Sequence, residues 1–194
     1  MNSRIEPLDW KKIWLRKGKE PTNDLLVLNG YENRNISPSY VAKKIQDTLG
    51  FNQNSSVLEV GCGSGMIAQY YDCNYGGVDY SETLVKKHID ILGNTVYVAD
   101  ADKLPFPDKS FDYVFSMSVF HYFPNADYVK RAISEMSRVA RKNIFIGDLP
   151  MSSHDDNHLL FSKSDFYDWS TSDGYYNKER FNVFRSATVG QVSE

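Results

Sequence analysis

A glycine-rich loop and two aspartates lie where strands of a parallel sheet would end. The segment 57–65 reads VLEVGCGSG, so an apolar run leads directly into three alternating glycines. These glycines are Gly61, Gly63 and Gly65. Asp79 and Asp100 follow two other short runs of β-branched and aromatic residues. Because glycine permits positive φ angles and close backbone approach, and because parallel strands end at one edge, we expect these residues to reach one ligand.

The acidic residues indicate which ligand that edge would hold. Asp79, after the second strand, can accept hydrogen bonds from both hydroxyls of a ribose, and Asp100 can accept one from an exocyclic amine. Together, a ribose with two hydroxyls and an exocyclic amine are the groups of an adenosine. Glu59, immediately before the loop, favours a cationic ammonium or sulfonium group and opposes a pyrophosphate. The spacing G-x-G-x-G also departs from the G-x-G-x-x-G of dinucleotide sites, so the residues favour S-adenosylmethionine (SAM) over a nicotinamide cofactor.

Strand-like and helix-like segments alternate from about residue 56 onward, and they would position the loop and the acids. The expected strands are 56–60, 75–79, 95–99, 111–116, 143–147 and 180–189. The expected helices are 66–71, 82–92 and 126–140, preceded by one that starts at Pro38 after the N-cap Ser37 and ends at Gly50. Such alternation is typical of parallel strands joined by crossover helices. It predicts an α/β fold with a doubly wound, mostly parallel Rossmann-like sheet and helices on both faces.

Three segments resemble one family specifically, the type 11 class I SAM-dependent methyltransferases, which include enzymes of ubiquinone and menaquinone biosynthesis. They are 57–65, the segment GVDYS at 77–81, and the segment DADKLPFPDKSFD at 100–112. The similarity covers roughly residues 37–150. It implies transfer of a methyl group from SAM by in-line displacement to an oxygen or nitrogen of the acceptor, or less favourably to a carbon.

The resemblance also implies a role for each candidate binding residue. In that family the loop and its preceding acid hold the methionine part of SAM, the second-strand acid holds the ribose, and the third-strand acid and its neighbour hold the adenine. The corresponding residues are Glu59, Gly61, Gly63 and Gly65 for the methionine part, Asp79 for the ribose, and Asp100 and Ala101 for the adenine. Ser116, at the end of the fourth strand, is expected near the amino group of the cofactor. Either aspartate alone could simply cap a helix, but their combination with the loop favours binding.

A catalytic base is needed only when the acceptor must lose a proton, because methyl transfer from a sulfonium can rest on alignment alone. The histidine candidates are His121, His154 and His158. His121 is favoured as the catalytic residue because it follows the fourth strand at the edge where substrate would approach. The segment 154–158, HDDNH, contains residue types that bind metals. Contiguous polar residues of this kind are typical of a solvated loop, so no metal site is predicted.

The chain of 194 residues is long enough for one substantial core. Residues 1–36 are expected to form a short helix near Trp10 and a possible lid, and residues 37–194 a SAM-binding domain. A net charge of -3 argues against a nucleic-acid partner and favours a small-molecule acceptor. Only two cysteines, no apolar leader and no long apolar run predict a cytoplasmic protein without an integral membrane segment. Nothing in the residues indicates an oligomeric state.

Two other classes of function stay open at this point. A non-catalytic module could keep the fold and bind the cofactor as a sensor or in support of a partner subunit, although an intact glycine loop argues against this. A nicotinamide-dependent oxidoreductase would share the sheet, but the loop spacing and Glu59 disfavour it.

Overall fold

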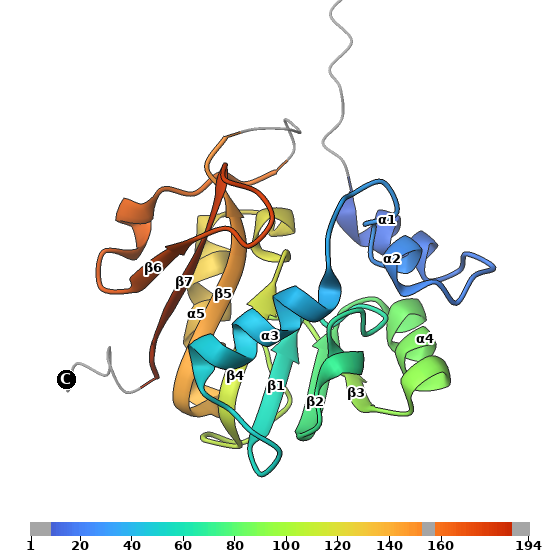
Figure 1. Cartoon of the computed structure of the whole chain (residues 1–194), viewed down its shortest axis with the longest axis horizontal. Helices are drawn as coiled ribbons and strands as arrows, with labels where there is room; N and C mark the ends of the chain where they lie inside the picture. The colour runs from blue at the N-terminus through green and yellow to red at the C-terminus, as the bar shows by residue number, and fades with distance from the viewer. Residues whose placement is uncertain (1–8, 153–157, 188–194) are drawn as a thin grey trace, which may run out of the picture.

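A seven-stranded sheet with the order β3-β2-β1-β4-β5-β7-β6 forms the centre of the molecule (Figure 1). The structure is a computed structural model and describes residues 9–152 and 158–187. The strands are β1 (Ser56–Val60), β2 (Asn74–Asp79), β3 (Thr95–Val98), β4 (Phe111–Met117), β5 (Ala140–Pro150), β6 (Ser170–Asp173) and β7 (Arg180–Ser186). Strands β1 to β5 pair in parallel, whereas β7 is antiparallel to both β5 and β6. The first five strands therefore end at one edge.

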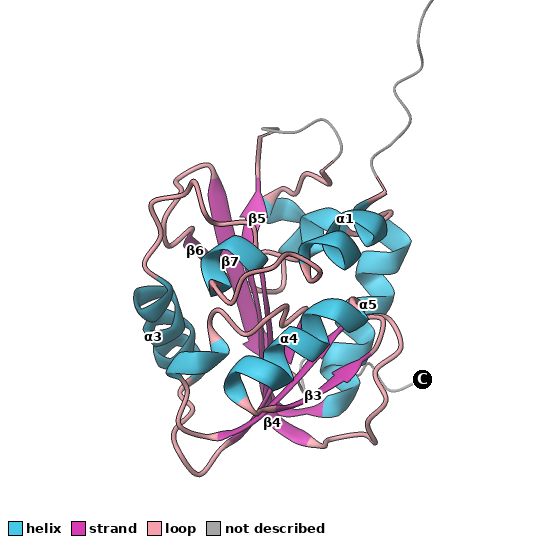
Figure 2. Cartoon of the chain, turned by 90° about the vertical axis from the view of Figure 1, so that its right-hand side faces the viewer, coloured by secondary structure: helices cyan, strands magenta, loops and turns pink. Residues whose placement is uncertain are grey.

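Helices cover both faces of this sheet. The helices of the described residues are α1 (Trp10–Lys17), α2 (Leu25–Leu28), α3 (Pro38–Leu49), α4 (Glu82–Leu92) and α5 (Ala126–Val139), with 3-10 turns η1 (Ala68–Tyr70), η2 (Phe120–Tyr122) and η3 (Lys163–Phe166). Of these, α3, α4 and α5 contact the strands, whereas α1 packs on α4. Figure 2 shows α3 and α5 on opposite sides of the strands. As predicted, α3 starts after the N-cap Ser37, whose hydroxyl accepts a hydrogen bond from the Tyr40 amide, and ends at Gly50 with φ 77°.

Alternating side chains of β1 divide the apolar core between the two faces. Leu58 and Val60 are buried with Met136 of α5, and Val57 is buried with Ile45 of α3. Burial on both faces explains why β1 reads as a nearly continuous apolar run. The predicted doubly wound α/β fold is confirmed. No helix in the described ranges is long and apolar enough to cross a membrane.

Three predicted elements differ in the structure. The helix expected over 66–71 is wrong, because only the turn η1 forms there. Met66, Ile67 and Ala68 are three consecutive buried residues, a pattern that does not match the spacing of one buried helix face, and the chain continues through η1 into β2. The strand β5 is longer than the expected 143–147 at both ends, and β7 ends at Ser186 instead of residue 189, which lies outside the described residues. The polar edge strand β6 was not predicted.

Candidate cofactor and acceptor site

The glycine loop after β1 is tightly enclosed by other parts of the chain. Gly61 has φ 81°, and a Cβ atom there would lie 2.4 Å from a methyl group of Val119. Gly63 has φ 50°, and its Cβ would lie 2.2 Å from Oδ1 of Asn29. Gly65 instead approaches α4, where Leu92 would be 2.5 Å from an added Cβ. Both the positive φ angles and the lack of space require glycine at these three positions.

The carboxylate of Asp79 holds the glycine loop against the end of β2. It accepts hydrogen bonds from the backbone N–H of Gly63 at 3.0 Å and of Ser81 at 2.8 Å. Only 9% of the residue surface is exposed, and burial raises the pKa of Asp79 to about 6, against the lowering effect of the two N–H groups. The predicted ribose-binding residue therefore has a structural role as well.

Glu59 is a second buried carboxylate beside the loop. It is 3% exposed and accepts a hydrogen bond from the Tyr75 hydroxyl at 2.7 Å. Burial raises the pKa of Glu59 to about 8, and the nearby negative charge of Asp79 adds to the rise. Burial disfavours the ionised form of both carboxyls, and no cation of the described chain forms an ion pair with either. A cationic ligand bound near them would stabilise their ionised forms and would itself be attracted to them.

A pocket of about 700 Å³ lies at the carboxyl edge of the sheet. Its wall includes five of the residues predicted from the sequence: Glu59, Gly61, Gly63, Asp79 and Ala101. A volume of this size is typical of sites for cofactors and drug-sized ligands. The structure thus brings the glycine loop, the residue before it and the ends of the second and third strands together around one space.

Four other predicted residues lie next to this wall but outside it. Gly65 packs on α4, as described above. Asp100 is half-exposed and forms an ion pair with Lys11 at 2.7 Å. Ser116 is fully buried and donates a hydrogen bond to the Val60 carbonyl at 2.8 Å. His121, in η2, is buried beside a separate cavity of about 30 Å³. The large pocket is lined at the end of β4 by Met117 and Ser118, which follow Ser116 in the chain.

The N-terminal segment contributes several wall residues that no motif pointed to. These are Asp9, Trp10, Lys11, Trp14, Asn29 and Tyr31. Side-chain hydroxyls of Tyr80, Ser81 and Thr83, just after Asp79, donate to backbone carbonyls of α1 at 2.8 to 3.2 Å. The amide of Asn29 donates to the Ser64 hydroxyl at 2.6 Å. The segment is therefore docked on both turns that carry the predicted binding residues.

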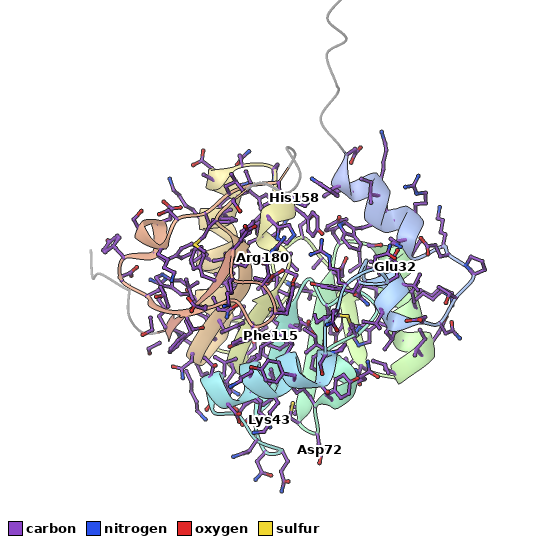
Figure 3. The ribbon with its side chains drawn as sticks, turned by 45° about the horizontal axis from the view of Figure 1, so that its top comes forward. Glu32, Lys43, Asp72, Phe115, His158 and Arg180 are labelled. Carbon is purple, nitrogen blue, oxygen red and sulfur yellow. The ribbon has the colours of Figure 1, made fainter. Side chains whose placement is uncertain are left out.

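Aromatic rings form much of the remaining wall. The ring centroid of Trp10 is 4.7 Å from that of Tyr122 and 4.8 Å from that of His158, which stacks on it. Trp14 contacts Tyr122 edge-on at 5.3 Å. Figure 3 shows the labelled His158 in the upper part of the molecule, above Arg180. Of the other histidine candidates, His154 lies outside the described residues.

Comparison with known proteins agrees with this geometry. Residues 58–146 match the model of a methyltransferase domain family. The chain is 33% identical over 132 residues to a phthiotriol/phenolphthiotriol dimycocerosates methyltransferase of Mycobacterium tuberculosis, a match that covers 63% of this chain and 47% of the relative. The chain spans about half the length of the first curated relatives that it matches.

Two solved structures share the fold. Phosphoethanolamine N-methyltransferase 1 of Haemonchus contortus superposes with a TM-score of 0.73 at 14% identity, covering 91% of this chain and 48% of that one. Magnesium protoporphyrin IX methyltransferase of Synechocystis, solved with bound SAM, superposes with a TM-score of 0.64 at 14% identity over 93% and 92%. The fold is that of class I methyltransferases. The resemblance to SAM-dependent methyltransferases of type 11 is supported by the family match over residues 58–146 and by methyltransferase relatives.

The two raised pKa values make the stability of the protein pH-dependent in a defined direction. Between the ordinary carboxyl pKa and the folded value, the unfolded chain has lost a proton that the folded chain keeps, so the free energy of unfolding falls as the pH rises. For Glu59 this window runs from 4.5 to about 8. Urea unfolding at pH 5 and pH 8 should therefore show a smaller loss of stability in Glu59→Gln than in the unsubstituted protein. Equal losses in the two proteins would show that Glu59 is not destabilised by its burial.

Proposed function

We propose that this chain binds SAM in the large pocket and transfers its methyl group to a small-molecule acceptor. The observation that supports this most strongly is the convergence of Glu59, the glycine loop, Asp79 and Ala101 on one pocket at the carboxyl edge of the sheet. Methyltransferase relatives and neighbours of the same fold add to the support.

The pocket residues fit the chemical groups of SAM. Gly61 and Gly63 leave the backbone open for close approach, and the buried Glu59 suits a positively charged amino group. Each carboxylate oxygen of Asp79 accepts one backbone hydrogen bond and keeps further lone-pair capacity for ribose hydroxyls. Asp100, Ala101, Ser116 and Gly65 would act at or just behind this surface.

When bound, SAM supplies a methyl group on a sulfonium that is already a good leaving group. The chain's task is then to align the acceptor, exclude water and receive any proton that the acceptor loses. The aromatic wall of Trp10, Trp14 and Tyr122 favours a small organic acceptor over a nucleic acid, and the net charge of -3 points the same way. We further propose an oxygen or nitrogen as the acceptor atom and a cytoplasmic location.

Cofactor binding can be tested without knowing the acceptor. In isothermal titration calorimetry, S-adenosylhomocysteine (SAH) should bind with a Kd on the order of micromolar, and NAD should not bind detectably. Asp79→Ala should raise the Kd of SAH roughly 10- to 150-fold, because charge-assisted hydrogen bonds worth about 1.5 to 3 kcal/mol would be lost.

A matched control for that variant is Asp47→Ala, which removes an exposed acid of α3 that pairs only with Lys43 in the described structure and lies outside the pocket wall. It should leave the Kd of SAH unchanged. If Asp79→Ala remains folded and binds SAH as tightly as Asp47→Ala, Asp79 is not part of the cofactor site. Binding of NAD in preference to SAH would instead favour an oxidoreductase, and SAH binding without methylation of any acceptor would favour a non-catalytic module.

We also propose that residues 1–36 act as a lid over the cofactor. Asn29 of this segment contacts the cofactor loop directly, because its amide bonds to Ser64 and its Oδ1 occupies the space beside Gly63. The docked segment then closes the pocket from one side and keeps water from the reacting groups.

Asn29→Ala should raise the Kd of SAH about 5- to 30-fold, because the hydrogen bonds that hold the segment on the glycine loop are lost, at about 1 to 2 kcal/mol. Asn23→Ala is the control, since Asn23 lies in the same segment and, among the described residues, its side chain accepts a hydrogen bond from Lys87 of α4 and contacts no part of the glycine loop. Isothermal titration calorimetry compares the Kd of SAH for the two variants, and circular dichroism checks that both are folded. Equal affinities in the two variants would argue against a lid that stabilises bound cofactor.

A further inference from the structure

Two non-glycine residues with left-handed backbone angles end neighbouring strands at the pocket. Ser118 follows β4 with φ 58°, and Asp148, near the end of β5, has φ 65°. The Ser118 N–H donates to the carbonyl of Gly147 at 3.1 Å, which fixes the two strand ends side by side. A left-handed angle in a non-glycine residue costs roughly 1 to 3 kcal/mol and is retained where the side chain is needed in that direction.

The side chains of these two residues bond directly to each other. The Ser118 hydroxyl donates to Oδ2 of Asp148 at 2.6 Å. The same oxygen accepts from the Arg180 guanidinium at 2.8 Å, and the Asp148 N–H donates to Asn182 at 3.0 Å. Asp148 and Arg180 are both almost completely buried. A buried ion pair is seldom more stabilising than apolar residues of the same size, so stability alone does not account for it.

Ser118 connects this buried carboxylate to the large pocket. It is only partly buried and lines both the large pocket and the cavity of about 30 Å³ that Asp148 and Arg180 border. Asp148 is absent from the wall of the large pocket, and so is His121. A molecule in the large pocket can therefore reach Asp148 through the Ser118 hydroxyl.

We propose that Ser118 and Asp148 form a relay that accepts the proton lost by a hydroxyl acceptor during methyl transfer, an inference that rests on the proposed function. The acceptor proton passes to Ser118 Oγ, and the Ser118 proton passes to Asp148 Oδ2. The acceptor oxygen uses its electron pair to bond the methyl carbon, and the pair of the breaking carbon–sulfur bond stays on sulfur. The products are a methyl ether, a neutral thioether and a protonated Asp148, so charge is conserved.

The surroundings of Asp148 are consistent with a base of intermediate strength. Burial raises the pKa of Asp148, while Arg180 and the Ser118 hydroxyl oppose that rise. The other titratable or charged groups that border the small cavity are Tyr31, Arg34, His121 and Tyr122, and Tyr176 reaches Ser118 with its hydroxyl at 3.2 Å. A general base works best when its pKa is close to the working pH, and burial moves this carboxyl in that direction.

The substitution that tests the relay most directly is Ser118→Gly. Glycine adopts φ 58° without strain, and this relief opposes the cost of the lost hydrogen bond to Asp148, so the variant should fold while it loses the hydroxyl. SAH affinity should stay within about threefold of the unsubstituted protein, whereas methylation of catechol, the probe hydroxyl acceptor, should fall at least 100-fold, within the range for loss of general-base catalysis. Lys109→Gly is the matched control, because Lys109 has φ 56° but lies outside both cavities. It should keep normal turnover.

A second acceptor separates proton transfer from simple positioning. Palmitate carries a carboxylate that has no proton to lose at neutral pH, so any turnover with it should be nearly unchanged in Ser118→Gly. Asp148→Asn keeps the shape, and asparagine tolerates the left-handed angle, but it leaves Arg180 buried without its charge partner. If it folds, it should behave like Ser118→Gly and lose the acidic limb of the pH profile with catechol.

The measurements distinguish failure of the relay from failure of the proposed function. Catechol turnover maintained in Ser118→Gly, or an equal loss with catechol and palmitate, would overturn the relay. Methylation of palmitate but not of catechol by the unsubstituted protein would also overturn it, because no proton would need to be accepted. Failure of the unsubstituted protein to bind SAH would instead contradict the proposed function.

Discussion

Two hydrogen bonds to the carboxylate of Asp79 join the turns from which the pocket is built. One oxygen accepts from Gly63 in the glycine loop, and the other accepts from Ser81 at the start of α4. The Ser81 hydroxyl in turn donates to the Trp14 carbonyl, which places α1 over the same point. Burial of this carboxylate is unfavourable and is only partly offset by these bonds, as its raised pKa indicates. The shape of the pocket therefore depends on a group that the folded chain holds at an electrostatic disadvantage.

The short connection between β1 and β2 explains why the N-terminal segment matters to the site. After the glycine loop, the chain makes only the turn η1 before it enters β2, so this connection provides little wall of its own. Asn29 of the N-terminal segment fills the space beside Gly63 that a side chain at that position would need. Gly63 thus permits the conformation of the loop and also leaves room for the docking of a segment more than thirty residues earlier in the chain.

The sequence was informative where one local pattern determines the structure. Short runs of β-branched and aromatic residues located β1 to β4 within one residue, and burial on both faces strengthens that signal in β1 and β4. The edge strand β6 reads STSD, without an apolar pattern, and is held by pairing with β7 and by the Asn182 side chain of that strand. Likewise α1 lies over the pocket because Tyr80, Ser81 and Thr83 bind its carbonyls. These contacts of α1 join segments about seventy residues apart, and spacing within one segment cannot reveal them.

Small differences in strand length had the largest effect on the site residues. Strand β4 continues to Met117, so Ser116 stays inside the sheet and bonds to Val60, while Ser118 reaches the pocket. The turn η2 then carries His121 to the small cavity beside Asp148 and Arg180. A motif locates this stretch correctly, but the conformation at its end decides which of its side chains face the ligand.

The buried carboxylates of the site differ in how their charge is balanced. Among the described residues, Asp148 has a buried cation partner, Arg180, whereas no ion pair is formed by Glu59 or Asp79. Burial raises the pKa of Glu59 to about 8 and that of Asp79 to about 6, and a cationic ligand would stabilise the ionised forms of both. Arg180 stabilises the ionised form of Asp148 without any ligand. Without Arg180, Asp148 would tend to hold a proton as Glu59 does, and a protonated carboxyl could not accept another from Ser118.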